Sequence, residues 1–212
     1  MIKLTGQDSA LAQPSSSSKL GKDFFNRPTL TVAQDLLGAI LVRKTNTHLL
    51  TGMVVETEAY VGEDDPASHA YGGMTARNKL MYGPAGLAYI YFIYGNHYCL
   101  NFVTEPEGFP AAVLIRALQP LAGLEQMFEN RSRVKYEIQL CNGPGKLCQA
   151  LRIDQKLNGI SLASSQLFLL AGNSSVPIGN SPRIGISQGR DRKWRYYIKN
   201  NAYVSNLKGA SR

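Results

Sequence analysis

The chain has 212 residues and a formal net charge of +8 at pH 7; 44% of its residues are hydrophobic and 18% are charged. This length and composition suit a folded domain with a sizeable core, and they exclude a disordered chain. The excess of positive charge favours a polyanionic partner, either nucleic acid or an anionic lipid surface, without choosing between them.

The N-terminal residues lack a continuous apolar run, so we expect neither a signal peptide nor a membrane span. We predict a flexible tail over 1–21 and a single domain over 22–208. The three cysteines, Cys99, Cys141 and Cys148, are odd in number and lack the spacing of a metal site. We expect buried thiols in a reducing compartment, either the cytoplasm around the nucleoid or the nucleus.

The predicted elements combine hairpins with helices. In chain order we expect a helix over 31–37 and a strand after it, a strand over 51–62, a hairpin over 87–105, a buried strand over 111–118, helices over 121–131 and 143–153, and strands over 181–187 and 192–200. The helix over 121–131 has apolar positions at Leu121, Leu124 and Phe128, and Pro144 suits the first turn of the helix over 143–153. The pattern predicts an α+β fold: one domain with a largely antiparallel curved β-sheet, surrounding helices and a protruding β-hairpin.

Acidic residues are concentrated in one short passage of this basic chain. Five of the fifteen lie within ten positions: Glu56, Glu58, Glu63, Asp64 and Asp65. In a strand over 54–60 the period of two directs Glu56, Glu58 and Tyr60 to one face. That face is compatible with a solvated polar surface or with a site. We expect residues 63–65 to lie in a mostly solvated loop.

Arg116 lies inside the apolar run AAVLIRAL. An unpaired guanidinium is costly to bury, so we expect a carboxylate or a water-linked partner beside it. A purely structural ion pair would satisfy this requirement. A pair that opens onto a cleft could also hold and polarise a water molecule.

Five tyrosines cluster around the predicted hairpin. We expect Tyr89 and Tyr98 in the core, whereas Tyr94 precedes the turn Gly95-Asn96 and would form an exposed wedge at the tip. A two-residue turn would put Tyr91 and Asn101 on opposite faces. A three-residue loop over 95–97 would place them opposite each other on one face.

Basic residues are concentrated in the last thirty positions. This segment contains Arg183, Arg190, Arg192, Lys193, Arg195, Lys199, Lys208 and Arg212 against the single acid Asp191, with Trp194, Tyr196 and Tyr197 between them. It is compatible with a solvated basic face, but the interleaved aromatics favour contact with a nucleic-acid backbone. Lys146 at a helix start suits a phosphate, and Arg77 with Lys79 could add a second clamp.

Four segments together resemble the alkyladenine (3-methyladenine) DNA glycosylase family. They are VVETEAYVGEDDPASHAYGG, RNKLMYGPAGLAYIYFIYGNHYCLNF, AAVLIRALQPLAGLEQM and LCNGPGKLCQAL, in this order. The likeness extends from Phe24 to Leu207. It implies a single-domain protein that flips a damaged purine out of duplex DNA and hydrolyses its N-glycosidic bond.

The resemblance also implies roles for individual residues. Glu58 would be the general base that activates water, and Arg116 with the backbone carbonyl of Ile184 would help to hold that water. The remaining matches are Tyr60, His69 and Tyr91 around the flipped base, Asn101 against the exocyclic amine of normal guanine, Tyr94 in the gap left in the helix, and Lys146 on a phosphate. Glu56 matches the strand but receives no catalytic role.

The resemblance further implies double-stranded DNA containing damaged purines as the partner, with no metal or other cofactor. We expect a monomer that binds no membrane. Because no lysine is an obvious Schiff-base nucleophile, we expect a monofunctional enzyme that leaves the abasic strand uncut.

Two other functions fit parts of the pattern. A nucleic-acid-binding module without chemistry, for DNA or RNA, would need only the basic tail and the exposed aromatics. A carbohydrate hydrolase that uses Glu56 and Glu58 as a pair is disfavoured, because carboxylates two residues apart on one strand can hardly flank a sugar ring.

Overall fold

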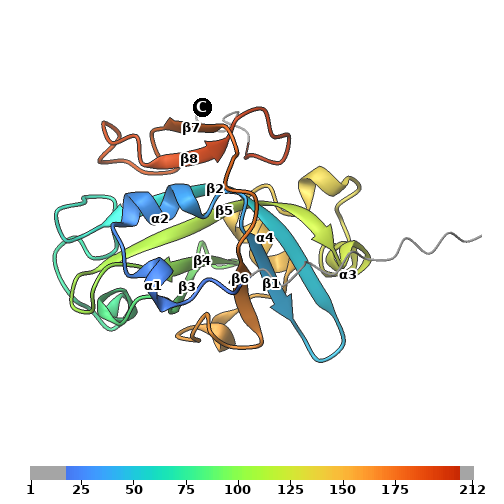
Figure 1. Cartoon of the computed structure of the whole chain (residues 1–212), viewed down its shortest axis with the longest axis horizontal. Helices are drawn as coiled ribbons and strands as arrows, with labels where there is room; N and C mark the ends of the chain where they lie inside the picture. Colours follow the sequence, from blue (N-terminus) through green and yellow to red (C-terminus); the bar gives the residue numbers. More distant parts are fainter. Residues whose placement is uncertain (1–17, 206–212) are drawn as a thin grey trace, which may run out of the picture.

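The computed structural model describes residues 18–205 and confirms the α+β class (Figure 1). The strands are β1 (Ile40–Lys44), β2 (Leu49–Val61), β3 (Ala88–Ile93), β4 (His97–Val103), β5 (Ala111–Ala122), β6 (Leu167–Leu170), β7 (Ile178–Ser181) and β8 (Arg195–Ile198). The α-helices are α1 (Lys22–Phe25), α2 (Thr29–Asp35), α3 (Leu124–Asn130) and α4 (Pro144–Ala150), and the 3-10 helices are η1 (Lys79–Tyr82), η2 (Glu137–Gln139) and η3 (Gln155–Leu157). Among these residues, no helix combines the length and apolar character needed to cross a bilayer.

All strands belong to one curled antiparallel sheet. Its main path runs β3-β4-β5-β2-β1-β6, and β8 joins β2 to β7. The long strand β2 pairs with β5 along one edge, while β1 and β8 share its other edge. β2 therefore connects the hairpin side of the sheet with the C-terminal β-ribbon, drawn in red in Figure 1.

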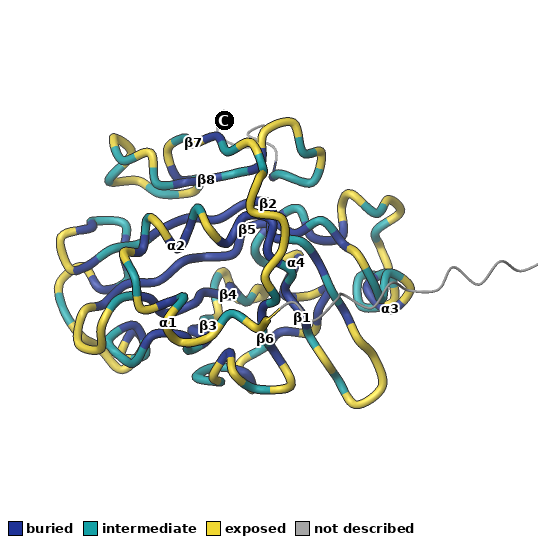
Figure 2. Tube along the Cα trace, in the orientation of Figure 1, coloured by how far each residue is buried: buried dark blue, intermediate teal, exposed yellow. Residues whose placement is uncertain are grey.

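The two faces of β2 have different neighbours. The Thr57 hydroxyl donates to the Ala33 carbonyl of α2 at 2.7 Å, so this face packs beneath the helix. Glu56, Glu58 and Tyr60 contact polar groups on the other face, as the predicted alternation requires. Figure 2 shows that β2 and β5 are buried along most of their length. Charged side chains on this face are therefore held away from bulk water.

Predicted elements are present with shifted ends, and the predictions for one helix and one strand are wrong in part. Leu121 belongs to β5 and is exposed, so the helix starts only at Leu124. Gly123 separates the two elements with a φ of 77°, and a Cβ there would lie 2.7 Å from the Leu49 carbonyl oxygen. The strand predicted over 181–187 ends at Ser181, because the next residues direct their polar groups to β2 rather than to a neighbouring strand.

The predicted hairpin is confirmed with an odd-length loop, but the loop position is wrong. Ile93 pairs with His97, so the loop consists of residues 94–96. Tyr94 and Gly95 have φ values of 54° and 73°, the left-handed conformation that tight hairpin turns need. As a result Tyr91 lies opposite Cys99, and Asn101 lies opposite Tyr89.

The ends of the described region bear on the predicted tail. Residues 1–17 of that tail, and Lys208 and Arg212 of the basic segment, lie outside the described residues. In the described part of the predicted tail, the Leu20 N–H donates to the Leu169 carbonyl of β6 at 2.9 Å, and Lys19 forms a β-bridge with Leu170. The backbone just before α1 is therefore attached to the edge of the sheet.

Candidate active site

A cavity of about 300 Å³ opens between the β3–β4 hairpin, β5 and the loop after β7. This volume lies at the lower end of the range for small-ligand sites. Seven of the predicted site residues line it: Tyr60, His69, Tyr91, Tyr94, Asn101, Arg116 and Ile184. These side chains come from segments up to 124 positions apart, and the fold brings them together around one space.

Aromatic rings form one wall of the cavity. The rings of His69 and Tyr91 meet edge to face with centroids 4.4 Å apart. The Nδ1 atom of His69 lies 2.9 Å from the Tyr89 hydroxyl, which fixes the imidazole from behind. Burial lowers the pKa of His69 to about 4, so the ring is neutral at pH 7. This wall suits a planar aromatic ligand and adds no positive charge from the histidine.

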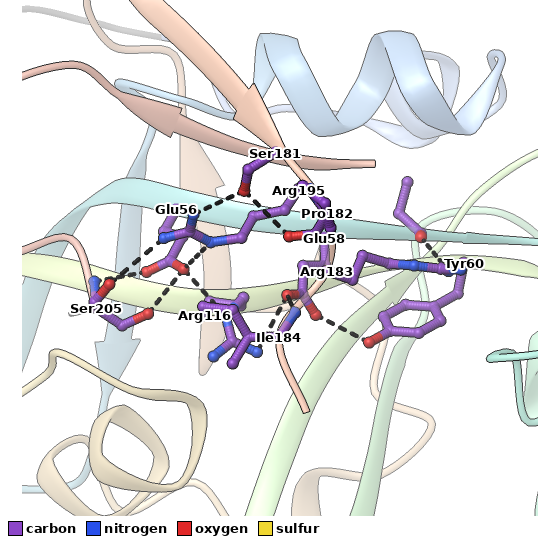
Figure 3. A network of polar contacts seen from close by, with 11 residues as sticks. Glu56, Glu58, Tyr60, Arg116, Ser181, Pro182, Arg183, Ile184, Arg195 and Ser205 are labelled. Carbon is purple, nitrogen blue, oxygen red and sulfur yellow. Dashed lines mark hydrogen bonds and ion pairs between the residues drawn. The ribbon is translucent and has the colours of Figure 1, made fainter. Parts of the chain in front are cut away.

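Glu58 lies beneath the cavity and is completely buried. Its Oε2 accepts a hydrogen bond from the Tyr60 hydroxyl at 2.8 Å, and its Oε1 accepts one from the Ile184 N–H at 2.7 Å. The Arg116 Nη1 lies 3.3 Å from Oε1. Figure 3 shows Glu58 beside Tyr60, Arg116 and Ile184. Glu58 is not itself a lining residue, but all three of these partners are, so its carboxylate lies directly behind the cavity wall.

Burial and hydrogen bonding act on Glu58 in opposite directions. Burial raises the pKa of the Glu58 carboxyl, while Arg116, the Ile184 N–H and the Tyr60 hydroxyl each lower it. Burial also raises the pKa of Tyr60 well above its ordinary value, so its hydroxyl keeps the proton that it donates. The result is a carboxylate that is dry, oriented and more basic than one in water.

The prediction that Arg116 needs a carboxylate partner is confirmed, and it has two. Its Nε donates to Glu56 Oε1 at 3.1 Å, while its Nη1 faces Glu58. Glu56 also accepts from Arg195 Nε at 2.6 Å, from the Ser205 N–H at 2.7 Å and from the Ser205 hydroxyl at 2.8 Å. Sequence reasoning gave Glu56 no role; the structure makes it the centre of a buried network that adjoins Glu58 (Figure 3).

Three charged residues predicted at the surface are buried instead. Asp65 is completely buried rather than solvated, and it pairs with Arg183. Arg183 and Arg195 belong to the basic C-terminal segment, yet their guanidinium groups satisfy Asp65 and Glu56. They cannot contact a polyanion, which leaves exposed residues such as Arg190, Lys193 and Lys199 in that segment. The paired acidic and basic residues lie in separate segments of the sequence, so their pairing could not be predicted from the sequence.

Asn101 is buried at the cavity wall with a defined orientation. Its Nδ2 donates to the carbonyl oxygens of Tyr89 and Cys99 at 2.9 and 3.4 Å. Both hydrogen bonds use the amide nitrogen, so the side-chain oxygen is the group available to a bound ligand.

The predicted DNA-contacting residues lie at or close to the cavity. Tyr94 is 80% exposed at the hairpin tip. The Arg77 guanidinium lies 5.5 Å from the centroid of the Tyr91 ring. Lys146 is exposed in the first turn of α4, and its Nζ donates to Asn142 at 2.8 Å. Pro144 of the same helix lines the cavity, as do Tyr94 and Tyr91, so each of the three predicted residues either lines the cavity or is close to a residue that does.

The fold and the site together define a class of protein. A buried carboxylate behind an aromatic cavity, with exposed cationic residues close by, is the arrangement expected of a hydrolase that acts on an aromatic base attached to a polyanion. Within residues 18–205, no cluster of three or more His, Cys, Asp or Glu side chains is arranged to hold a metal ion.

Comparison with known proteins identifies the family. Residues 23–202 match the family described as Methylpurine-DNA glycosylase (MPG). Curated relatives named "Putative 3-methyladenine DNA glycosylase" occur in Methanocella arvoryzae (49% identity, covering 88% of this chain and 95% of the relative), Clostridium perfringens (46%, covering 88% and 98%) and Prosthecochloris aestuarii (50%, covering 87% and 89%). The chain belongs to the methylpurine-DNA glycosylase family and is a hydrolase of N-glycosyl bonds. The resemblance inferred from its sequence is confirmed.

Proposed function

We propose that this enzyme excises damaged purines from duplex DNA by flipping the base into the cavity and hydrolysing its N-glycosidic bond with a water activated by Glu58. The observation that carries the proposal is the buried Glu58 carboxylate, held by three residues that line the aromatic cavity. The 3-methyladenine named for the relatives is one expected substrate.

Chemistry at the sugar explains why one carboxylate is enough. Breaking the C1′–N bond builds oxocarbenium character on the sugar, which an adjacent ionised carboxylate stabilises. Water adds to C1′ and gives its proton to Glu58, while the purine leaves with the electron pair of the broken bond. Arg116 and the backbone carbonyl of Ile184 are proposed to orient that water, because both residues adjoin Glu58 and line the cavity.

Selectivity for damaged bases has two physical sources. Extrusion from the helix costs a few kcal/mol, least for a damaged or mispaired base, and stacking on tyrosine returns roughly 1–3 kcal/mol per base. A positively charged alkylated purine gains about 0.5–2 kcal/mol more from electron-rich rings. We propose that Tyr60, His69 and Tyr91 supply the stacking surfaces, while Asn101 crowds the exocyclic amine of undamaged guanine.

Base release from defined duplexes tests the proposed function. Duplexes carrying a single 3-methyladenine, 7-methylguanine, hypoxanthine or ethenoadenine would be compared with undamaged DNA, with free base and strand breaks measured separately. We expect release of at least one lesion base and an abasic strand that breaks only after alkali. Failure on all four lesions, with DNA binding retained, would favour the non-catalytic module; a strand nicked in nuclease-free protein would contradict a monofunctional enzyme.

The pH–rate profile should have an acid limb, a fall in rate at low pH, that reports the protonation of Glu58. Because burial raises the pKa of this carboxyl above 4.5, and only the ionised form can accept a proton, the rate should fall as pH decreases through that raised pKa. The measurement is the single-turnover rate across pH 4 to 9 with DNA saturated by enzyme. The limb should be absent from the residual rate of Glu58→Gln; an identical limb in that variant would assign it to another group.

Tyr94 should contribute to base flipping without stabilising the fold. Its side chain is 80% exposed, so Tyr94→Ala should change the free energy of unfolding by less than about 0.5 kcal/mol. Losing a stack worth roughly 1–3 kcal/mol should lower the single-turnover rate, measured with enzyme in excess over DNA but below saturation, by about tenfold. Tyr136→Ala is the matched control, because Tyr136 is 67% exposed and does not line the cavity. Equal rates for the two variants would remove Tyr94 from the mechanism.

A further inference from the structure

Two of the three partners of Glu58, Tyr60 and Ile184, lie next to a second buried ion pair, formed by Asp65 and Arg183. Arg183 Nη1 donates to Asp65 Oδ2 at 2.5 Å, and its Nη2 donates to Asp65 Oδ1 at 2.7 Å. Both side chains are completely buried. Two parallel hydrogen bonds between a guanidinium and a carboxylate fix the relative orientation of the two groups as well as stabilising the pair. It joins the loop after β2 to the loop between β7 and β8.

Arg183 contacts the catalytic strand in two further ways. Its Nη1 also donates to the Ala59 carbonyl at 2.9 Å, on the residue between Glu58 and Tyr60. Its guanidinium carbon lies 4.6 Å from the centroid of the Tyr60 ring. The Tyr60 ring is therefore held from one side by Arg183 and through its hydroxyl by Glu58. The same guanidinium carbon lies 5.2 Å from the centroid of the Trp194 ring.

The residue after Arg183 supplies a hydrogen bond to Glu58. Ile184 donates its backbone N–H to Oε1 at 2.7 Å, although residues 182–194 form no regular strand or helix that would fix their position. Asp65 in turn is oriented by the Val61 and Ala67 N–H groups, at 3.3 and 3.2 Å. The backbone of a loop is thus placed against Glu58 by a side chain pair anchored in β2 and the segment after it.

We propose that Asp65 and Arg183 are positioning residues of the proposed glycosylase reaction, acting as one unit that holds Tyr60 and the Ile184 N–H against Glu58. This inference rests on the proposed function and extends it beyond the residues that touch substrate. Arg192 is a peripheral part of the arrangement, because its Nη1 lies 3.8 Å from Asp65 Oδ1 and its side chain is partly exposed.

Disturbing the unit should change the acid limb as well as the rate. The Ile184 and Tyr60 hydrogen bonds both lower the pKa of Glu58, so loosening them should move the limb to higher pH. The titratable and charged groups around Glu58 are Glu56 and Tyr60 on β2, Tyr91 on β3, Cys99 on β4, Arg116 on β5 and Arg183 on the loop after β7. A purely structural loss would lower the fraction of active enzyme and leave the limb unchanged.

The test compares Asp65→Asn, Arg183→Lys and the double variant Asp65→Asn/Arg183→Gln with wild type under single-turnover conditions. We expect each to lower the rate at saturating enzyme by about ten- to a hundredfold, as a displacement near 1 Å at a reacting centre does, with DNA affinity changed less than threefold. The double variant should be no slower than Asp65→Asn alone, because the pair acts as one unit. Asp35→Asn is the matched control; Asp35 pairs with Arg27 at the surface.

Stability and function are separated by two further comparisons. Leu169→Ala in β6, at the edge of the sheet opposite the hairpin, should lower thermal stability with the acid limb unchanged. If Asp65→Asn does not fold, Arg183→Lys keeps the buried charge and carries the test. A wild-type rate or an unshifted acid limb in the folded variant would overturn the positioning role, whereas absence of base release by wild type would overturn the proposed function instead.

Discussion

Replacing Glu58 by glutamine should lower the single-turnover rate of purine release by about 10²–10⁴-fold, the usual contribution of one positioned general base. Glutamine keeps the shape of the side chain but cannot accept the proton of the attacking water. Binding to lesion-containing duplex should persist or tighten, because a negative charge near the DNA has been removed. The measurement pairs the rate at saturating enzyme with the dissociation constant at one fixed salt concentration.

The same passage offers a matched control for this substitution. Glu63→Gln makes the identical chemical change at an exposed position, where within residues 18–205 the carboxylate accepts a hydrogen bond only from the Tyr82 hydroxyl, at 2.6 Å. It should retain the wild-type rate. Comparable loss in both variants, or an active Glu58→Gln enzyme, would place the general base elsewhere.

Replacing Glu56 by glutamine should lower the free energy of unfolding by about 3–5 kcal/mol, the usual effect of removing one partner from a buried ion pair. Glu56 accepts four hydrogen bonds from Arg116, Arg195 and Ser205. Arg195 is only 2% exposed, so its guanidinium would lose its carboxylate without gaining water. Denaturant unfolding at pH 7 measures the change, and Glu129→Gln on exposed helix α3 surface is the control.

The two glutamate variants should differ in kind. Glu56→Gln, measured well below its unfolding transition, should keep far more activity than Glu58→Gln, because Arg116 retains Glu58 as a partner. Glu58→Gln should unfold near the wild-type midpoint, since burial already disfavours the charge of this carboxyl. The reversed pattern, with Glu56 essential for the rate and Glu58 dispensable, would contradict the assignment of the two acids.

Local patterns in the sequence predicted much of the fold and the cavity. The alternation in β2 placed Glu56, Glu58 and Tyr60 on one face, and an arginine inside an apolar strand required an acidic partner nearby. The first inference needs only the two-residue period of a strand, and the second needs only the cost of burying an unpaired charge. Both can be read from residues that are neighbours in the sequence. The exposure of Tyr94 at the hairpin tip could also be predicted, because an aromatic residue beside a turn has little core to join.

Long-range pairings could not be predicted in the same way. Asp65 meets Arg183 across 118 positions, and Glu56 meets Ser205 across 149. Nothing in an acidic loop or a basic tail distinguishes a charge that will be buried from one that stays solvated. The hairpin register was also undetermined, since it depends on whether Tyr94 accepts a left-handed conformation.

The structure of Glu58→Gln bound to a duplex with one damaged purine tests the central claim most directly. We expect the purine outside the helix, between the rings of Tyr60, His69 and Tyr91, with C1′ one water molecule away from the side chain at position 58. A purine still stacked in the duplex, or a sugar whose C1′ is turned away from that side chain, would contradict it.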